Sequence, residues 1–417
     1  MSKQPQALPD FRLAYYYGDR KTGHLAVISS RSGKISVDAI PDAPTTGLEP
    51  LLRPVLIGVT PDQRAVLMDP KSKTIRYSAT FPVDAFPAHV YSDPRAPCDW
   101  FMNDGDKMTG NDTINCGEQG SSVTVIEHAD STQARFLQTI CVGRGHHQAA
   151  FTYPAPGVAA NVPRHAYISN LNDGTVSIIG NDPADATTYL KLLATINLCE
   201  PDKEGDGTTG VPNKAFPHGL AYSPTTGKVH NLNNGYGSVA VIDPLTHAIE
   251  KRVPLKGYSN LFPAPGGRFL VARGADRKSN PQHVIAKLGL VDASTLTVVA
   301  SIELRDIYLS KYFFSPDGAM LYFTTGESGS PEQLANLRTN TLLVFDLRQL
   351  PTFALRREIV VGSAGTLAFL PQQGATTLVF SSDTAGGQLT VIDANSDHVI
   401  TQIAVNPGAS HSRIWLL

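Results

Sequence analysis

The chain has 417 residues, with 35 Lys and Arg against 37 Asp and Glu, which gives a formal net charge of −2. This near-neutral balance argues against nucleic-acid binding, and the 41% hydrophobic content argues against extensive disorder. No apolar run approaches the roughly 18 residues that a membrane-spanning helix needs. We therefore expect a folded protein with a large core, no nucleic-acid partner and no membrane span.

The N-terminal segment lacks the apolar stretch of a signal peptide. We expect a cytoplasmic protein, or a periplasmic or secreted one if a leader has been removed. The four cysteines, Cys98, Cys116, Cys141 and Cys199, are compatible with two disulfides or with four thiols. Cys98 and Cys116 flank a polar loop, and a disulfide between them would indicate an oxidising compartment.

Short β-rich runs bounded by Gly, Pro, Asn and Asp follow one another along the chain, whereas helical periodicity is nearly absent. The chain begins with three predicted strands, at residues 13–18, 24–29 and 34–38. The clearest unit, residues 216–257, has four predicted strands, at residues 218–222, 228–232, 238–243 and 249–253. Four antiparallel strands of this length form one blade of a β-propeller.

This unit repeats through the chain. The third strand of each unit recurs as LAVIS, VTVIE, TVSII, VAVID, LGLVD, LLVFD and LTVID, and the first interval is long enough for two units. The last predicted strand, residues 409–416, has no unit of its own. We expect it to pair with the N-terminal strands and so to close the ring. This gives eight blades; seven remain the alternative if residues 45–85 form an excursion.

The repeated unit resembles the YVTN-repeat, YncE-like β-propeller family and, more distantly, the haem-binding propeller of nitrite reductases. The resemblance covers nearly the whole chain and implies an all-β fold: a single propeller domain over residues 1–417, with one blade shared by residues 12–40 and 409–417. Family members include enzymes, haem carriers and surface-layer proteins, so the resemblance is specific for fold and uninformative about function.

The long polar loops fall on one face of the predicted ring. Strand direction alternates within a blade, so the connections between second and third strands share a face with those that lead into the next blade. The longest are residues 103–120, 199–215, 273–283 and 325–340, whereas the opposite face has short turns. Elaborate loops on a rigid scaffold often carry function, so this loop-rich face is the predicted working face.

Four histidines lie near the starts of predicted innermost strands, at the mouth of the channel on this face: His89, His147, His218 and His411. Converging imidazoles can bind a transition metal; copper or iron is favoured here, and zinc also fits. His146 is adjacent to His147, and only one of the two can face the channel. The alternative for any one of them is a histidine that hydrogen-bonds the backbone of the neighbouring blade.

Other charged residues could complete such a site. Asp104 and Asp106 could handle protons or, in a different chemistry, bind calcium, and the alternative is an ordinary polar turn. Arg273 and Arg413 could hold an anionic cofactor.

We therefore predict a metal-dependent oxidoreductase that acts on a small molecule at the channel mouth. One alternative is a non-catalytic scaffold for a protein partner or a haem-like cofactor on the loop-rich face. The other is a calcium-dependent hydrolase of the lactonase type.

Overall fold

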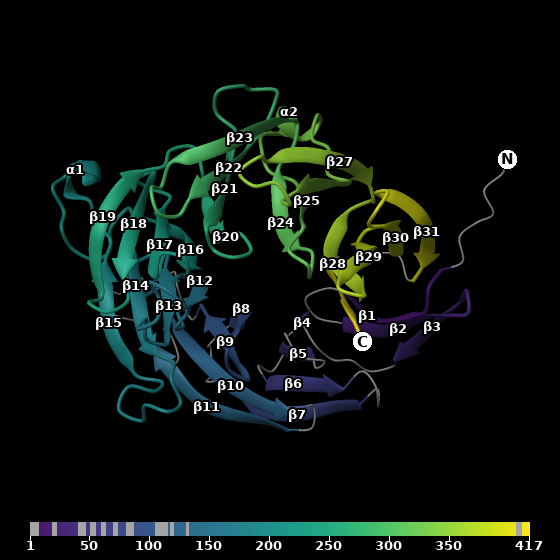
Figure 1. Cartoon of the computed structure of the whole chain (residues 1–417), viewed down its shortest axis with the longest axis horizontal. Coiled ribbons are helices and arrows are strands. Elements are labelled where there is room, and N and C mark those ends of the chain that lie inside the picture. Colours follow the sequence, from purple (N-terminus) through teal and green to yellow (C-terminus); the bar gives the residue numbers. More distant parts are fainter. Residues whose placement is uncertain are drawn as a thin grey trace.

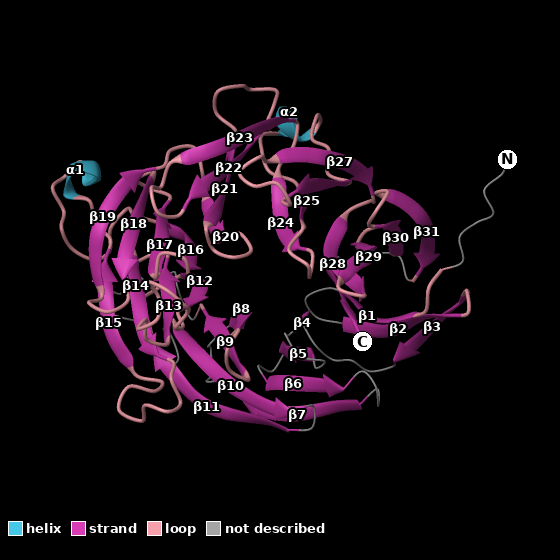
Figure 2. Cartoon of the chain, viewed as in Figure 1, coloured by secondary structure: helices cyan, strands magenta, loops and turns pink. Residues whose placement is uncertain are grey.

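The computed structural model shows short antiparallel sheets arranged in a ring, with two short helices in connecting loops (Figures 1 and 2). No helix among the described residues combines the length and apolarity needed to cross a membrane. The structure describes residues 8–18, 23–40, 47–50, 56–59, 64–69, 74–80, 87–104, 116, 121–130, 133–405 and 411–417.

These residues form eight four-stranded sheets, as the sequence predicted. The first sheet joins the two ends of the chain in the order β3–β2–β1–β32, so the predicted pairing of the C-terminal strand is confirmed. Its strands are β1 (Phe11–Gly18), β2 (Gly23–Arg31), β3 (Lys34–Ile40) and β32 (His411–Leu416).

Each of the other seven sheets consists of four consecutive strands. The second to fourth sheets comprise β4 (Gly47–Pro50), β5 (Leu56–Val59), β6 (Arg64–Asp69), β7 (Thr74–Thr80), β8 (Pro87–Ser92), β9 (Cys98–Asn103), β10 (Ser122–Asp130), β11 (Gln133–Cys141), β12 (His146–Phe151), β13 (His165–Asn170), β14 (Thr175–Gly180) and β15 (Leu192–Asn197). Helix α1 (Pro201–Glu204) follows in the loop that leads to the fifth sheet.

The last four sheets continue the same order around the ring. They comprise β16 (Pro217–Ser223), β17 (Lys228–Asn233), β18 (Ser238–Asp243), β19 (Ala248–Pro254), β20 (Asn260–Pro263), β21 (Phe269–Asp276), β22 (Ile285–Asp292), β23 (Val298–Arg305), β24 (Leu309–Phe314), β25 (Met320–Thr325), β26 (Thr341–Asp346), β27 (Ala354–Val360), β28 (Ala364–Gln372), β29 (Ala375–Asp383), β30 (Gln388–Asp393) and β31 (His398–Ala404). Helix α2 (Pro331–Leu334) lies between β25 and β26.

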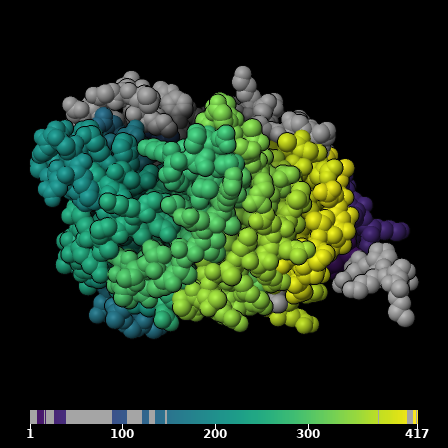
Figure 3. Space-filling model, turned by 90° about the horizontal axis from the view of Figure 1, so that it is seen from above, coloured from purple at the N-terminus to yellow at the C-terminus, as the bar shows by residue number. Residues whose placement is uncertain are grey.

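The hydrophobic core lies between adjacent sheets. One cluster, which includes Tyr167, Leu220 and Ile242, joins the fourth sheet to the fifth. Another joins the first sheet to the last, where the rings of Phe11 and Phe380 lie 4.8 Å apart. Burial of these apolar faces is the main stabilising term for the stacked blades, which lie side by side along the outer wall in Figure 3.

The aspartate that ends several of the third strands has a structural role. The carboxylate of Asp243 accepts a hydrogen bond from the backbone N–H of Leu245, and those of Asp292 and Asp393 make the equivalent bond two residues on. Such Asx turns end the strand and reverse the direction of the chain. The repeat motif therefore encodes the turn on the face opposite the long loops.

Candidate functional site

The innermost strands of the sheets begin at one end of the central channel. In every sheet the other three strands follow the innermost strand outward in the same order. The innermost strands of the different sheets therefore run in the same direction along the channel. Strands β8, β12 and β16 belong to three successive sheets of the ring (Figure 1), and β32 is the innermost strand of the first sheet. The backbones of the four predicted histidines thus lie in innermost strands, near their first residues.

His218 lies in a β-bulge, because the pairing of β16 with β17 shifts between Pro217 and Leu220. Its Nδ1 lies 2.6 Å from the carbonyl oxygen of Ser259, in the loop that enters the next sheet. A carbonyl can only accept, so Nδ1 donates and the neutral ring carries its lone pair on Nε2. The expected alternative, a histidine bonded to the backbone of a neighbouring blade, is therefore observed at this position.

The surroundings of His218 favour the neutral imidazole. Burial lowers its pKa, the Ser259 carbonyl acts in the opposite direction, and the charge of Arg273 lowers the pKa further. A neutral ring with its lone pair on Nε2 is the form of histidine that binds a metal.

His147 occupies the same backbone position as His218 in the preceding sheet, within a shift between His146 and Ala149. Its side chain, like that of His146, is outside the described part of the structure. The next residue, Gln148, is buried and ties the two sheets together. Its side-chain amide donates to the carbonyl of Leu220 and accepts from the Leu220 N–H, both at 3.2 Å.

His89 lies one position further along its strand, and the predicted bulge is present between Pro87 and His89. Its ring is exposed and lies 6.5 Å from that of Tyr91. The backbone of His411 pairs with Gly18 at the start of β32, and its side chain is outside the described residues.

Arg273 is the cation whose charge lowers the pKa of His218. It lies in β21, opposite Asn260 of β20, and Nη1 donates to the carbonyls of Leu309 and Ser310 in the next sheet. Nε is buried and has no hydrogen-bond partner among the described residues, and neither has Oδ1 of Asn260. No carboxylate of the described chain forms an ion pair with Arg273, and burial lowers the pKa of its guanidinium.

Arg273 lies one position before the repeat's asparagine. Asn103, Asn170 and Asn233 pair with the first residue of the third strand in their blades, and Gly274 takes that position here, opposite Lys287. Arg273 pairs with Leu288 as Leu232 pairs with Val239 in the preceding blade. This blade therefore has an arginine where the preceding blade has a leucine.

The other predicted site residues are more dispersed. Arg413, opposite Tyr16 in the first sheet, donates to the carbonyl of Ser412 at 3.0 Å. Asp104 follows β9, and its carbonyl accepts a hydrogen bond from Ser121. Asp106 lies outside the described residues. Within the described part of the chain, no three His, Cys, Asp or Glu side chains gather as a metal-binding group.

The expected disulfide between Cys98 and Cys116 was wrong. The disulfide joins Cys116 to Cys141 at the end of β11, and Cys98 is a buried thiol whose pKa burial raises to about 11. Tyr236, in the loop after β17, is buried, and its hydroxyl donates to Glu204.

No family model matches the chain, and no curated protein matches it. The fold is shared with solved structures of low sequence identity. The dihydro-haem d1 dehydrogenase NirN, solved in complex with DHE, is 11% identical with a TM-score of 0.57, over 99% of this chain and 76% of that one. Apo AztD from Citrobacter koseri is 11% identical with a TM-score of 0.51, over 98% of both chains.

A candidate 6-phosphogluconolactonase from Bacteroides uniformis is 13% identical with a TM-score of 0.50, over 97% of this chain and 99% of that one. At these identities the similarity establishes the β-propeller architecture alone.

Proposed function

We propose that the loop-rich mouth of the channel binds an anionic cofactor that carries copper or iron, and that the protein uses it as an oxidoreductase acting on a small molecule. His218 supplies the metal ligand and Arg273 the counter-charge. The observation that carries this proposal is the half-buried Arg273, whose Nε is fully buried, which has no carboxylate partner in the described structure, and whose charge acts on a histidine of defined tautomer.

Arg273 is the argument for an anion. A buried charge is costly unless it is paired, and a guanidinium matches the two oxygens of a carboxylate or phosphate. The orphan Nε of Arg273 and the orphan Oδ1 of Asn260 belong to directly opposed residues of β20 and β21. One donor and one acceptor are therefore left without partners on these opposed residues, and the donor is the atom that an anion would engage.

His218 is the argument for a metal. Metal-binding histidines usually donate a hydrogen bond from the N–H of their second ring nitrogen to a carbonyl or carboxylate. This bond fixes the tautomer and the orientation of the ring. Ser259 supplies that carbonyl here. His147, at the equivalent position of the neighbouring blade, is the proposed second ligand, and His89 and His411 are the further candidates.

The solved relatives add one consideration. NirN shares the fold over 99% of this chain, and its structure contains DHE. This supports a haem-like ligand as the class of cofactor for a site in which one histidine would hold the metal and an arginine would hold a carboxylate.

The roles of this chain's residues follow. The cofactor, when bound, supplies electron transfer at the metal. His218 would hold the metal through Nε2, while Nδ1 keeps its proton and donates it in a hydrogen bond to the Ser259 carbonyl. Arg273 neutralises an acidic group of the cofactor, and Arg413 is the proposed second cation. Asp104 and Asp106 are proposed to exchange protons with the substrate. The Cys116–Cys141 disulfide supports a periplasmic or secreted location.

A second candidate function is a non-catalytic scaffold that presents the loop-rich face to a protein partner. The hydrogen bond from His218 to Ser259 favours it, because the imidazole then serves only to tie two blades together.

Metal and cofactor analysis of protein purified without a histidine tag or chelator separates the two functions. We expect about one equivalent of copper or iron, or of a haem-like cofactor, after purification or reconstitution, and its loss in the His147→Ala/His218→Ala double variant. No bound metal or cofactor, even after reconstitution, would leave the scaffold as the remaining function.

A further inference from the structure

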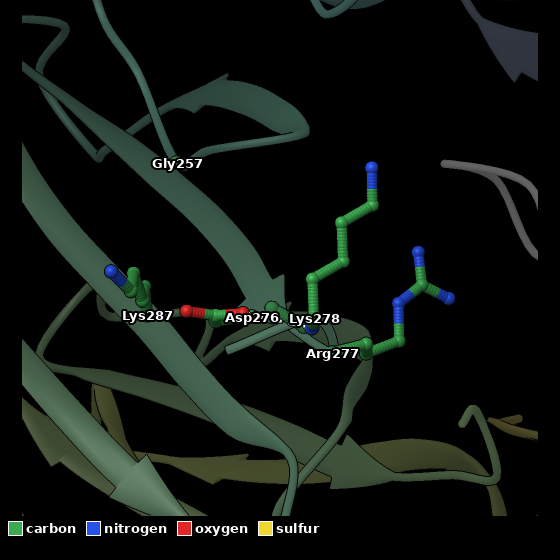
Figure 4. A pocket seen from close by; sticks show the side chains of 6 residues that line it. Gly257, Asp276, Arg277, Lys278 and Lys287 are labelled. Carbon is green, nitrogen blue, oxygen red and sulfur yellow. Dashed lines mark hydrogen bonds between the residues drawn. The ribbon is translucent and has the colours of Figure 1, made fainter. Parts of the chain in front are cut away.

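A separate cationic pocket lies at the end of the β21–β22 hairpin. It has a volume of about 240 Å³ and is lined by Gly257, Ala275, Asp276, Arg277, Lys278 and Lys287. Figure 4 shows Lys287 on one side of Asp276, with Arg277 and Lys278 on the other. Three cations against one carboxylate leave a net charge of +2 on the lining.

The backbone of the pocket depends on two glycines. Gly257 has a φ of 86°, in the left-handed region that glycine adopts without strain. A Cβ on Gly274 would lie 2.1 Å from the carbonyl oxygen of Gly257, so only glycine at position 274 allows this turn to pack against β21. Lys287 is paired with Gly274 across the hairpin, which places it beside the same turn.

The carboxylate of Asp276 is already used within its loop. It accepts hydrogen bonds from the backbone N–H groups of Lys278 and Ser279 and from the Ser279 hydroxyl. Asp276 therefore shapes the turn that carries Arg277 and Lys278.

The cations have few anionic partners. Arg277 donates to the hydroxyl of Ser328 and lies over the ring of Tyr308, and neither partner is charged. Among the described residues no ion pair involves Arg277 or Lys278, whereas Lys287 lies 3.3 Å from the exposed carboxylate of Glu303.

We propose that this pocket binds a phosphate group. The arginine and the two lysines that line this cavity carry the groups that recognise a phosphoryl dianion, and the lining charge of +2 matches a phosphoryl dianion better than a single carboxylate. The volume accommodates a small phosphorylated molecule or inorganic phosphate. This site is separate from the channel-mouth site and does not depend on the function proposed for His218.

Calorimetric titration of the full-length protein at constant ionic strength tests the proposal, with inorganic phosphate in one arm and glycerol 3-phosphate in the other. We expect saturable binding of one equivalent, with a Kd on the order of 1 mM or below. Tighter binding of the monoester would identify a phosphorylated metabolite as the ligand, and tighter binding of inorganic phosphate would identify the free ion.

The variant Arg277→Gln/Lys278→Gln should weaken binding at least about tenfold, because two charge-assisted hydrogen bonds are lost. The control Lys251→Gln/Arg357→Gln removes the same charge from exposed residues of the outer strands β19 and β27 and should change affinity less than about twofold. Equal weakening in both variants, or no saturable binding to the wild type, would overturn the proposal. His218→Asn should bind phosphate normally, so failure of the channel-mouth proposal would not affect this result.

Discussion

The Nδ1 atom of His218 lies 2.6 Å from the carbonyl oxygen of Ser259, a residue of the following blade. This single hydrogen bond has two consequences. It connects adjacent blades at the channel mouth, and it leaves the lone pair of the neutral ring on Nε2. A structural histidine needs only the first consequence, whereas a metal ligand needs both. Substitutions that separate the two nitrogens therefore separate the two roles.

His218→Asn should preserve stability and abolish metal or cofactor binding. The asparagine amide can donate to Ser259 from a position close to that of Nδ1 but supplies no imidazole nitrogen. His218→Ala removes both nitrogens and should lower the free energy of unfolding by about 1–3 kcal/mol, because the partly buried Ser259 carbonyl loses its partner. Denaturant unfolding of the cofactor-free proteins measures stability, and metal analysis measures metal or cofactor binding.

Arg273→Met should weaken binding of an anionic cofactor at least about tenfold, because the counter-charge is lost. Its effect on the cofactor-free protein should stay within about 1 kcal/mol, since the lost bonds to Leu309 and Ser310 are offset by removal of a buried charge. Affinity is measured by titration and stability by denaturant unfolding. Arg357→Met, an exposed arginine on β27, is the control. Large destabilisation with unchanged affinity would make Arg273 a structural residue.

Two buried histidines should make stability fall in mild acid. Burial lowers the pKa of His165 and of His230 from 6.5 to about 4, and the neighbouring His247 also lowers that of His165. Between these values the unfolded chain binds more protons than the native chain, so the stabilisation is complete above pH 6.5 and is lost as the pH falls toward 4. Each residue contributes up to about 3 kcal/mol to this loss.

Urea unfolding between pH 7 and 4.5 measures this slope. His230→Gln keeps a donor for the Ala293 carbonyl, which Nε2 of His230 contacts at 3.1 Å, but cannot titrate. It should therefore show a shallower slope than the wild type. A wild-type stability that is flat across this range would contradict the prediction.

The ion pair between Arg144 and Asp173 should be essential for stability. The two side chains are 8% and 3% exposed, and Nε of Arg144 lies 2.7 Å from Oδ1 of Asp173. Asp173→Asn removes the carboxylate charge beside a buried guanidinium and should cost about 3–5 kcal/mol in free energy of unfolding. The matched change at an exposed pair, Asp346→Asn beside Arg348, should cost less than about 1 kcal/mol. Thermal unfolding measures both variants. Similar losses of stability in Asp173→Asn and Asp346→Asn would contradict the prediction that the buried ion pair contributes more than the exposed one.

The fold could be predicted because each blade carries its own signals. Third-strand motifs such as VAVID end in an aspartate that caps the following turn, and this local chemistry repeats without regard to distant contacts. The pairing of β32 with β1 followed from counting strands, because the first blade had three and the chain ended with one more.

The errors concern contacts that the repeat does not encode. Cys98 seemed a suitable partner for Cys116 because the two flank one loop, but Cys141 closes the pair from the far end of the hairpin β10–β11. His165, at the start of a second strand, packs against His247 of the neighbouring blade, with ring centroids 5.1 Å apart, and no sequence pattern indicates this contact. Contacts between blades depend on ring packing, which strand periodicity does not report.

The arrangement of the channel-mouth residues could be predicted only in part. Repeat alignment placed His147 and His218 at equivalent positions, and the backbone register agrees. The hydrogen bond to Ser259 and the unpaired Nε of Arg273 could not be predicted, because both depend on how a side chain reaches the next blade.

Haem titration of the wild type and of His218→Asn, followed by absorption spectroscopy, tests the central proposal most directly. The proposal predicts one equivalent of haem with the spectrum of a histidine-ligated iron in the wild type, and loss of that spectrum in a variant of unchanged stability. Identical spectra for the two proteins, or no haem binding by the wild type, would contradict it and leave His218 as a tie between blades.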